Sequence, residues 1–238
     1  MSSKLDNLIR LTAQTFLQRR ESLNSAGLAG LYSPAAGESQ STFQKSFSEL
    51  LAAVNNIKGD DVGLSKLLQY LNQLKRHKVT ALYTGIYEGP LFCVCIFILY
   101  PKSKIPLHSH PGMYGILKVL HGDVVVKSYT SINEVDYRKP TLPTFNAVER
   151  VECLSEKSSP AIITPENNLH EIVNQENQSA VFLDILSPRY ESENCYFGAT
   201  EYKPGVFEIN QIPCPTTFHT ITIPFPFKVK PPDRSSLS

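Results

Sequence analysis

The chain has 238 residues, 42% of them apolar and 19% charged, which is enough for one globular domain with a sizeable buried core. Its 23 basic and 22 acidic residues leave a formal net charge of +1, which argues against a protein that binds nucleic acid through a basic surface. The five cysteines are scattered and form no CxxC motif, which excludes a disulfide framework and makes a reducing compartment, cytoplasmic or nuclear, the expectation.

The first eighty residues are expected to be helical. Apolar side chains recur at helical spacing in residues 5–20, 41–59 and 63–78. Residues 22–41 are rich in Gly, Ser, Ala and Pro and predict a flexible linker between the first two helices. We therefore expect residues 1–80 to form a helical segment that packs on the domain that follows. The N-terminus lacks the uninterrupted apolar run of a signal peptide, so no membrane partner is expected.

From residue 81 onward the pattern is that of strands. The run Leu91 to Tyr100 is almost entirely apolar and predicts a buried strand, too short to span a bilayer. Two further apolar segments flank His121-Gly122-Asp123, and the glycine there predicts a hairpin. Other short strands are expected at 160–164, 169–173, 179–186, 206–210 and 218–223.

Short strands separated by Pro and Gly, with no helical pattern between them, predict a mainly β domain over residues 81–227, a sandwich or a barrel. Residues 131–157 carry charges and prolines and are expected to be a surface excursion. Residues 228–238 are expected to be a flexible tail.

The histidines give the first hint of chemistry. His108 and His110 stand two residues apart, and in a strand such residues point to the same side. The pair could begin a metal site, or it could be two surface histidines before a turn. A site needs a third ligand, and His170 at the start of a later strand is the best candidate. His121 is expected to face water at the tip of its hairpin, and His219 to be a structural histidine in a late strand.

A resemblance emerges from the later histidine. An HxH pair followed by Pro-x-Gly-x-x-His-x-x-x-Asn is typical of the cupin barrels. Pro165, His170 and Asn174 match the second part of that pattern. Asn167 stands where glycine is usual, and asparagine tolerates the positive φ that this turn would need.

The first part of the cupin pattern is incomplete. The glutamate ligand common in cupins would fall on Tyr114 or Gly115, so the chain resembles a three-histidine cupin. Residues 105–126, "IPLHSHPGMYGILKVLHGDVVV", closely resemble the family of cysteamine dioxygenases and plant cysteine oxidases. The later segments "NLHEI" and "FLDILSPRY" resemble the same family. The likeness extends weakly to the N-terminal helices and to "FPFK", so it covers most of the chain.

The resemblance implies a cupin-type double-stranded β-helix barrel with N-terminal helices, and iron(II) held by His108, His110 and His170. It implies a thiol dioxygenase that adds both atoms of O2 to sulfur and yields a sulfinic acid. The substrate would be cysteamine or the N-terminal cysteine of a protein. In the second case the product would enter an oxygen-dependent degradation route, and the enzyme would act as an oxygen sensor. The resemblance also implies a monomer.

The resemblance also implies three further candidates for catalysis. Asp184 would orient the substrate amine or a ligand histidine, unless it is a buried carboxylate satisfied by backbone donors. Tyr190 would line the pocket, or would be a packed aromatic at a turn. Cys195 matches a cysteine that relatives can couple to a tyrosine two residues later; here that position is Phe197, so we predict no crosslink. Tyr196 would point the other way.

Several alternatives stay open. A zinc or manganese cupin with hydrolase or isomerase activity would use the same three histidines. A metal-free cupin binding protein is a further possibility. Cys93 and Cys95 share one face of an apolar strand and are expected to be core thiols. The sequence does not distinguish cysteamine from a protein N-terminus.

Overall fold

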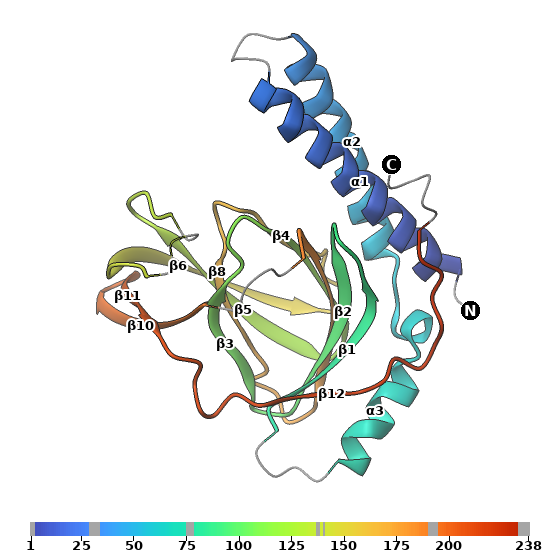
Figure 1. Ribbon diagram of the computed structural model, residues 1–238. Coiled ribbons are helices and arrows are strands. Elements are labelled where there is room, and N and C mark those ends of the chain that lie inside the picture. Colours follow the sequence, from blue (N-terminus) through green and yellow to red (C-terminus); the bar gives the residue numbers. More distant parts are fainter. Residues whose placement is uncertain are drawn as a thin grey trace.

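The computed structural model describes residues 3–28, 34–74, 79–136, 139, 141–189 and 195–232, and it shows helices packed on one side of a β-barrel (Figure 1). The described helices are α1 (Ser3–Leu28), α2 (Pro34–Asn55), the 3-10 helix η1 (Gly59–Val62) and α3 (Leu64–Gln73). The described strands are β1 (Ala81–Glu88), β2 (Cys93–Leu99), β3 (Lys104–Ser109), β4 (Tyr114–His121), β5 (Asp123–Ser131), β6 (Phe145–Ser155), β7 (Ala161–Ile163), β8 (Leu169–Val173), β9 (Ala180–Ser187), β10 (Cys195–Lys203), β11 (Val206–Ile212) and β12 (Thr220–Thr222).

The strands form two sheets that face each other. One sheet has the order β12-β1-β2-β9-β4-β7, and the other closes on itself in the order β10-β11-β6-β5-β8-β3. Apart from the parallel pair β1–β12, the strand pairs in both sheets are antiparallel. The mainly β, cupin-type double-stranded β-helix expected from the sequence is confirmed.

The hairpin expected around Gly122 is wrong. Gly122 does make a tight turn with φ of 70°, and a Cβ there would lie 2.9 Å from the carbonyl oxygen of Ser179. The strands on either side of it belong to different sheets, however, because β4 pairs with β7 and β9 whereas β5 pairs with β6 and β8. The glycine signal specifies a left-handed backbone at the turn, and it carries no information about which strands pair.

Three other segments differ from the expectation. The linker expected over residues 22–41 is helical up to Leu28 and again from Pro34, and residues 29–33 lie outside the described part. Proline is well suited to the first turn of a helix. The two helices contact each other outside this segment, as in the hydrogen bond from the Ser46 hydroxyl to the Gln18 side chain (2.6 Å).

The expected surface excursion over residues 131–157 contains β6, an eleven-residue strand between β5 and β11. Many of its side chains are exposed or half-buried, so its sequence lacks the apolar run that marks an interior strand. The expected tail is also packed at its start: Val229 contacts the helix–sheet core, and the Lys230 backbone N–H donates to Asp6 (3.2 Å). Residues 233–238 lie outside the described part.

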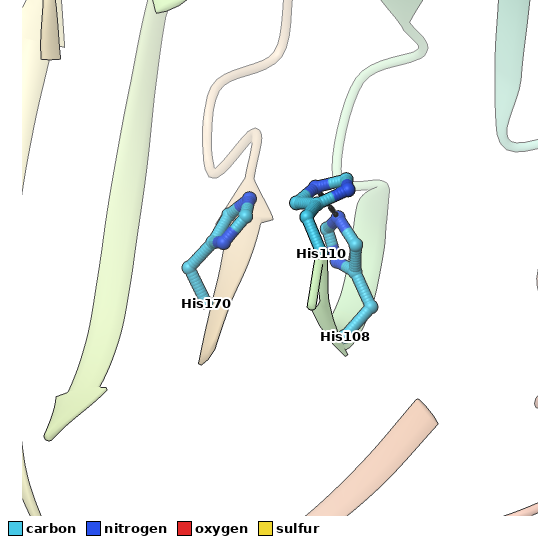
Figure 2. Close-up of side chains that lie close together, drawn as sticks. All are labelled: His108, His110 and His170. Atoms are coloured by element: carbon cyan, nitrogen blue, oxygen red, sulfur yellow. Dashed lines mark hydrogen bonds between the residues drawn. The ribbon is translucent and has the colours of Figure 1, made fainter. Parts of the chain in front are cut away.

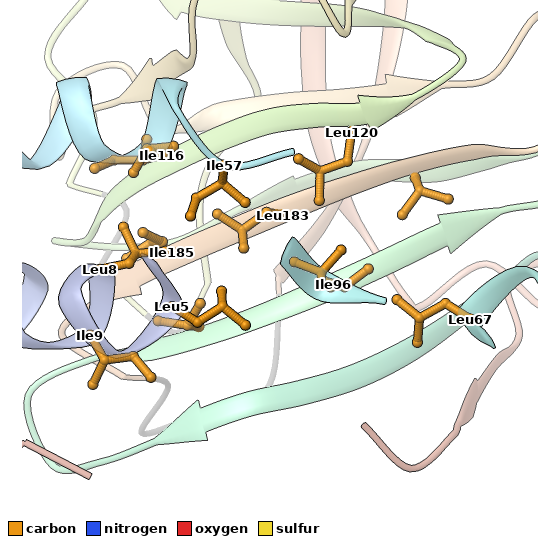
Figure 3. Close-up of a cluster of buried hydrophobic side chains, with 14 of the residues drawn as sticks. Leu5, Leu8, Ile9, Ile57, Leu67, Ile96, Ile116, Leu120, Leu183 and Ile185 are labelled. Atoms are coloured by element: carbon orange, nitrogen blue, oxygen red, sulfur yellow. The ribbon is translucent and has the colours of Figure 1, made fainter. Parts of the chain in front are cut away.

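The helices cover the outer face of the first sheet. Leu5, Leu8 and Ile9 of α1 pack on alternate residues of the central strands, including Leu183 and Ile185 of β9 (Figure 3). The side chains between them on β9 point into the barrel. Strand β9 is therefore buried on both faces, which explains its continuous apolar sequence. None of the described helices has the length and apolar character needed to cross a bilayer.

Candidate metal centre

Three histidines from two strands meet inside the barrel. His108 lies in β3 opposite His170 of β8 in the strand register, and His110 follows one residue after the end of β3. One ring nitrogen from each can be chosen so that all three lie within 4.8 Å of one another. The Nε2 atoms of His108 and His110 are 2.9 Å apart, and Figure 2 shows the three rings converging from the two strands.

Backbone carbonyls orient two of the rings. The Nδ1 atom of His108 lies 2.8 Å from the carbonyl oxygen of Pro106, and Nδ1 of His170 lies 3.1 Å from that of Asn168. Because a carbonyl oxygen only accepts, each Nδ1 carries the hydrogen, and each Nε2 keeps its lone pair for another partner. This is the arrangement by which metal-binding histidines are normally fixed.

Burial keeps the rings neutral. All three side chains are buried, and loss of hydration lowers the pKa of His108 to about 4. Loss of hydration and the proximity of His108 hold the pKa values of His110 and His170 well below the usual range. Neutral imidazole is the form that binds a metal ion. Three buried, neutral imidazoles that converge in this way therefore fit a divalent transition metal.

A cavity of about 300 Å³ adjoins His108 and His110. Its wall is apolar at Phe97, Ile105 and Ile172, and it carries hydroxyl groups at Tyr83, Tyr196, Thr220 and Thr222.

The carboxyl group of Asp184 is the acidic group of this cavity. Asp184 lies on β9, on the face turned into the barrel, and it is buried. Its Oδ1 has no hydrogen-bond partner, and burial raises the pKa of the carboxyl to about 7, against a smaller opposing effect of a backbone hydrogen bond from Ile185. A buried acceptor without a partner is costly, and it marks a place where a donor can bind.

The other candidates for catalysis are placed differently. The side chain of Cys195 is half-buried and packs against the cluster that contains Leu107 and Phe197, and it is not part of the cavity wall. Its neighbour Tyr196 lines the cavity instead, as the alternation of side chains along a strand predicts. Tyr190 lies outside the described residues.

The surroundings of two cysteines include more than the apolar core expected from the sequence. Cys93 and Cys95 are buried, as expected, but they also line the cavity beside the histidines. Burial, together with the nearby Asp184, raises the pKa of the Cys93 thiol to about 12 and holds the pKa of the Cys95 thiol well above its usual value. Both thiols are therefore protonated and weak nucleophiles. Their i, i+2 spacing was the available signal, but only the fold shows which face of the strand meets the histidines.

His121 and His219 are not part of the histidine cluster. His121 is partly exposed, and its Nδ1 is 3.7 Å from a carboxylate oxygen of Glu156. His219 is exposed and precedes β12, so its expected place within a strand is wrong. Lys102 is the one described residue other than glycine with positive φ, so the turn does not need the left-handed backbone considered for Asn167.

Tyr114, which occupies the region of the usual cupin glutamate, faces the helices. The guanidinium carbon of Arg19 lies 4.1 Å from the centre of its ring, and the rings of Phe16, Phe43 and Phe47 surround it. This cluster joins α1 and α2 to the start of β4. The position therefore serves the contact between the helices and the barrel.

Comparison with known proteins gives one family and several relatives. The model of the PCO_ADO family matches residues 53–210. The chain is 30% identical to 2-aminoethanethiol dioxygenase of Mus musculus over 211 residues, which cover 82% of this chain and 77% of that protein. It is 30% identical to plant cysteine oxidase 2 of Arabidopsis thaliana over 153 residues, which cover 62% of this chain and 53% of that protein.

Among solved structures, a Klebsiella pneumoniae protein with a double-stranded β-helix domain is similar over 44% of this chain and 73% of its own. The sequence identity is 19% and the TM-score is 0.31.

Proposed function

The chain belongs to the PCO_ADO family of thiol dioxygenases, and on this premise we propose that iron(II), bound by His108, His110 and His170, is the metal of its reaction. The observation that carries the proposal is the convergence of three buried, neutral imidazoles beside a cavity. Bound iron(II) supplies the redox chemistry by which both atoms of dioxygen are added to a thiolate sulfur, giving a sulfinic acid.

The three imidazoles also favour the deprotonated form of the substrate thiol. They bring no negative charge, so the full charge of a divalent ion faces the cavity. That charge stabilises a thiolate and lowers the pKa of an incoming thiol. In contrast, Cys93 and Cys95 are held protonated by burial. The cavity can in this way bind a substrate thiolate next to two thiols of its own.

We further propose that Asp184 binds the amine of the substrate. Cysteamine and an N-terminal cysteine both carry an amine two carbons from the sulfur. An ammonium group can donate to the unpartnered Oδ1 of Asp184, and the opposite charge would draw the carboxyl towards its ionised form.

The cavity admits either class of substrate. A volume of about 300 Å³ corresponds to about ten water molecules at ~30 Å³ each, which exceeds what cysteamine alone would fill. The cavity therefore has room for cysteamine or for the first residues of a protein chain. If protein N-termini are oxidised, the enzyme would act as an oxygen sensor upstream of degradation.

The test offers cysteamine and a Cys-initiated peptide to the iron-loaded chain in air and follows product mass. We expect a gain of two oxygen atoms on at least one of the two. The gain should be lost in His110→Ala and kept in the matched control His121→Ala, whose ring lies away from the cavity. Equal activity of His110→Ala and the wild type would contradict the proposal.

A further inference from the structure

His110 lies just beyond the end of strand β3, outside the hydrogen-bonded ladders of that strand. The ladder between β3 and β8 pairs Lys104, Ile105 and His108, and the ladder between β3 and β10 pairs His108 and Ser109. Neither reaches His110. A ligand just beyond a strand end has no ladder to fix its backbone, so its direction depends on other contacts.

The His110 carbonyl accepts a turn hydrogen bond from the backbone N–H of Met113 (3.0 Å), and the side-chain amide of Asn168 supplies the other contacts. Its Oδ1 accepts a hydrogen bond from the backbone N–H of His110, and its Nδ2 donates to the backbone carbonyl of the same residue. Asn168 is 1% exposed, and its Nδ2 also lies 3.4 Å from the carbonyl oxygen of Met113 and 3.5 Å from that of Thr164. The planar amide thus takes the place of a neighbouring strand for His110.

The backbone of the same residue fixes a second ring. The carbonyl oxygen of Asn168 accepts from Nδ1 of His170, which leaves Nε2 of His170 facing the other two histidines. Asn168 therefore links His110 and His170, ligands from two distant segments. An amide suits the task because one planar group offers both a donor and an acceptor, whereas a carboxylate offers acceptors alone.

We propose that Asn168 is a positioning residue that sets the affinity of the metal centre by fixing His110 relative to His170. The inference rests on the proposed function, in that the three histidines must bind a metal. Contacts that orient metal ligands typically change metal affinity by ~10–100-fold when they are lost. Loss of the Asn168 amide should therefore weaken metal binding beyond any effect on folding.

Asn174 provides a matched control at the other end of β8. It is also fully buried, and its Nδ2 lies within hydrogen-bond distance of the carbonyl oxygens of Leu99 (3.5 Å), Tyr100 (3.0 Å) and Gln178 (2.8 Å). Its Oδ1 accepts from the N–H of Glu176 (3.0 Å). Its replacement removes as many hydrogen bonds from the core as replacement of Asn168. Those bonds hold the far end of the strand and not the histidines.

The experiment compares Asn168→Ala with Asn174→Ala in the full chain. The melting temperature of the metal-free protein measures folding, and competition with a chelator measures Co(II) affinity, with the Co(II) absorption spectrum reporting ligand geometry. We expect both variants to melt earlier, but only Asn168→Ala to bind Co(II) ~10–100-fold more weakly and with an altered spectrum. Asn168→Ser keeps a shorter polar side chain in place of the planar amide, so it should fall between that variant and the wild type.

Wild-type Co(II) affinity in the Asn168 variants would overturn the proposal, as would an equal loss in Asn174→Ala. If Asn168→Ala does not fold, Asn168→Ser decides by the same criterion. A wild-type chain that binds no Co(II) would instead overturn the metal centre itself, and the positioning role with it.

Discussion

Asp184 is a carboxylic acid on the inner face of an otherwise apolar strand, and its titration gives a test that needs no substrate. Its pKa in the folded chain is about 7, against 3.8 ordinarily, because burial disfavours the charged form. Between these values the folded state binds a proton that the unfolded state has released. The contribution of this group to stability is therefore fully present below about pH 4 and is lost as the pH rises through 7.

Asp184→Asn should remove this dependence, because the amide stays neutral. In the metal-free protein we expect the variant and the wild type to be closest in stability near pH 4, and the variant to gain up to about 4 kcal/mol relative to the wild type by pH 8. Thermal melts of both proteins across this range measure the difference. A difference that does not change with pH would contradict the buried, protonated state of Asp184.

Cys195 gives a second prediction for single residues. It shares a face of β10 with Phe197, which has no phenol oxygen, and Tyr196 points to the opposite side. We therefore expect no thioether at Cys195. Mass spectrometry of tryptic peptides from the active protein measures this directly, and a peptide joined through Cys195 to any tyrosine would contradict it.

The sequence was sufficient for some of these residues and not for others. The i, i+2 rule and the later histidine motif were enough to predict that His108, His110 and His170 converge. Asn168 escaped prediction because its amide bonds His110 across 58 positions of the chain, and only the folded register reveals that partner.

At the scale of elements, the helices are stabilised by packing of an apolar stripe on the barrel, and not by the intrinsic stability of an isolated helix. Leu8 of α1 is fully buried against the outer face of the first sheet. Leu8→Ala should lower the free energy of unfolding by about 2–5 kcal/mol, since it removes buried methyl groups and leaves a cavity. The matched control Arg20→Ala, at an exposed position of the same helix, should change it by ~0.5 kcal/mol or less.

Denaturant unfolding measures both variants. Equal effects of the two substitutions would contradict the packing of α1 on the barrel. The larger effect of Leu8→Ala is expected from burial alone, so the comparison of the two variants does not depend on the metal.

Apolar runs predicted the buried strands, but the sequence did not predict which strands pair with each other. Strands β2 and β9 are apolar along their length because helices cover one face and the barrel interior covers the other. Strand β6 was missed because many of its side chains are exposed or half-buried. The turn at Gly122 was found, yet it joins two sheets and closes no hairpin, since pairing is set by contacts distant in sequence.

For the whole molecule, strand signals alone left a sandwich and a barrel equally open. The resemblance of residues 105–126 to known cupins decided for the barrel, and the ring β10-β11-β6-β5-β8-β3 agrees with it. The sequence could not predict the cavity, because its wall combines residues of strands far apart in the chain, from β1 and β2 to β10 and β12.

Metal exchange tests the chemistry of the whole site. Dialysis against a chelator should abolish thiol oxidation and lower the melting temperature, because a ligand that binds only the folded state stabilises it. Iron(II) should restore both properties. Zinc(II) should restore the melting temperature without activity, since it has no redox chemistry. Thiol oxidation by the zinc form at the rate of the iron form would contradict a redox role for the metal.

The most direct measurement uses dioxygen labelled with the heavy isotope of oxygen. The iron-loaded chain is given a thiol substrate, cysteamine or a Cys-initiated peptide, under labelled gas in ordinary water, and the product is weighed by mass spectrometry. We predict a sulfinic acid that carries two labelled oxygen atoms from the gas. A product with oxygen from water, or a thiol left unreacted with both substrates, would contradict the account.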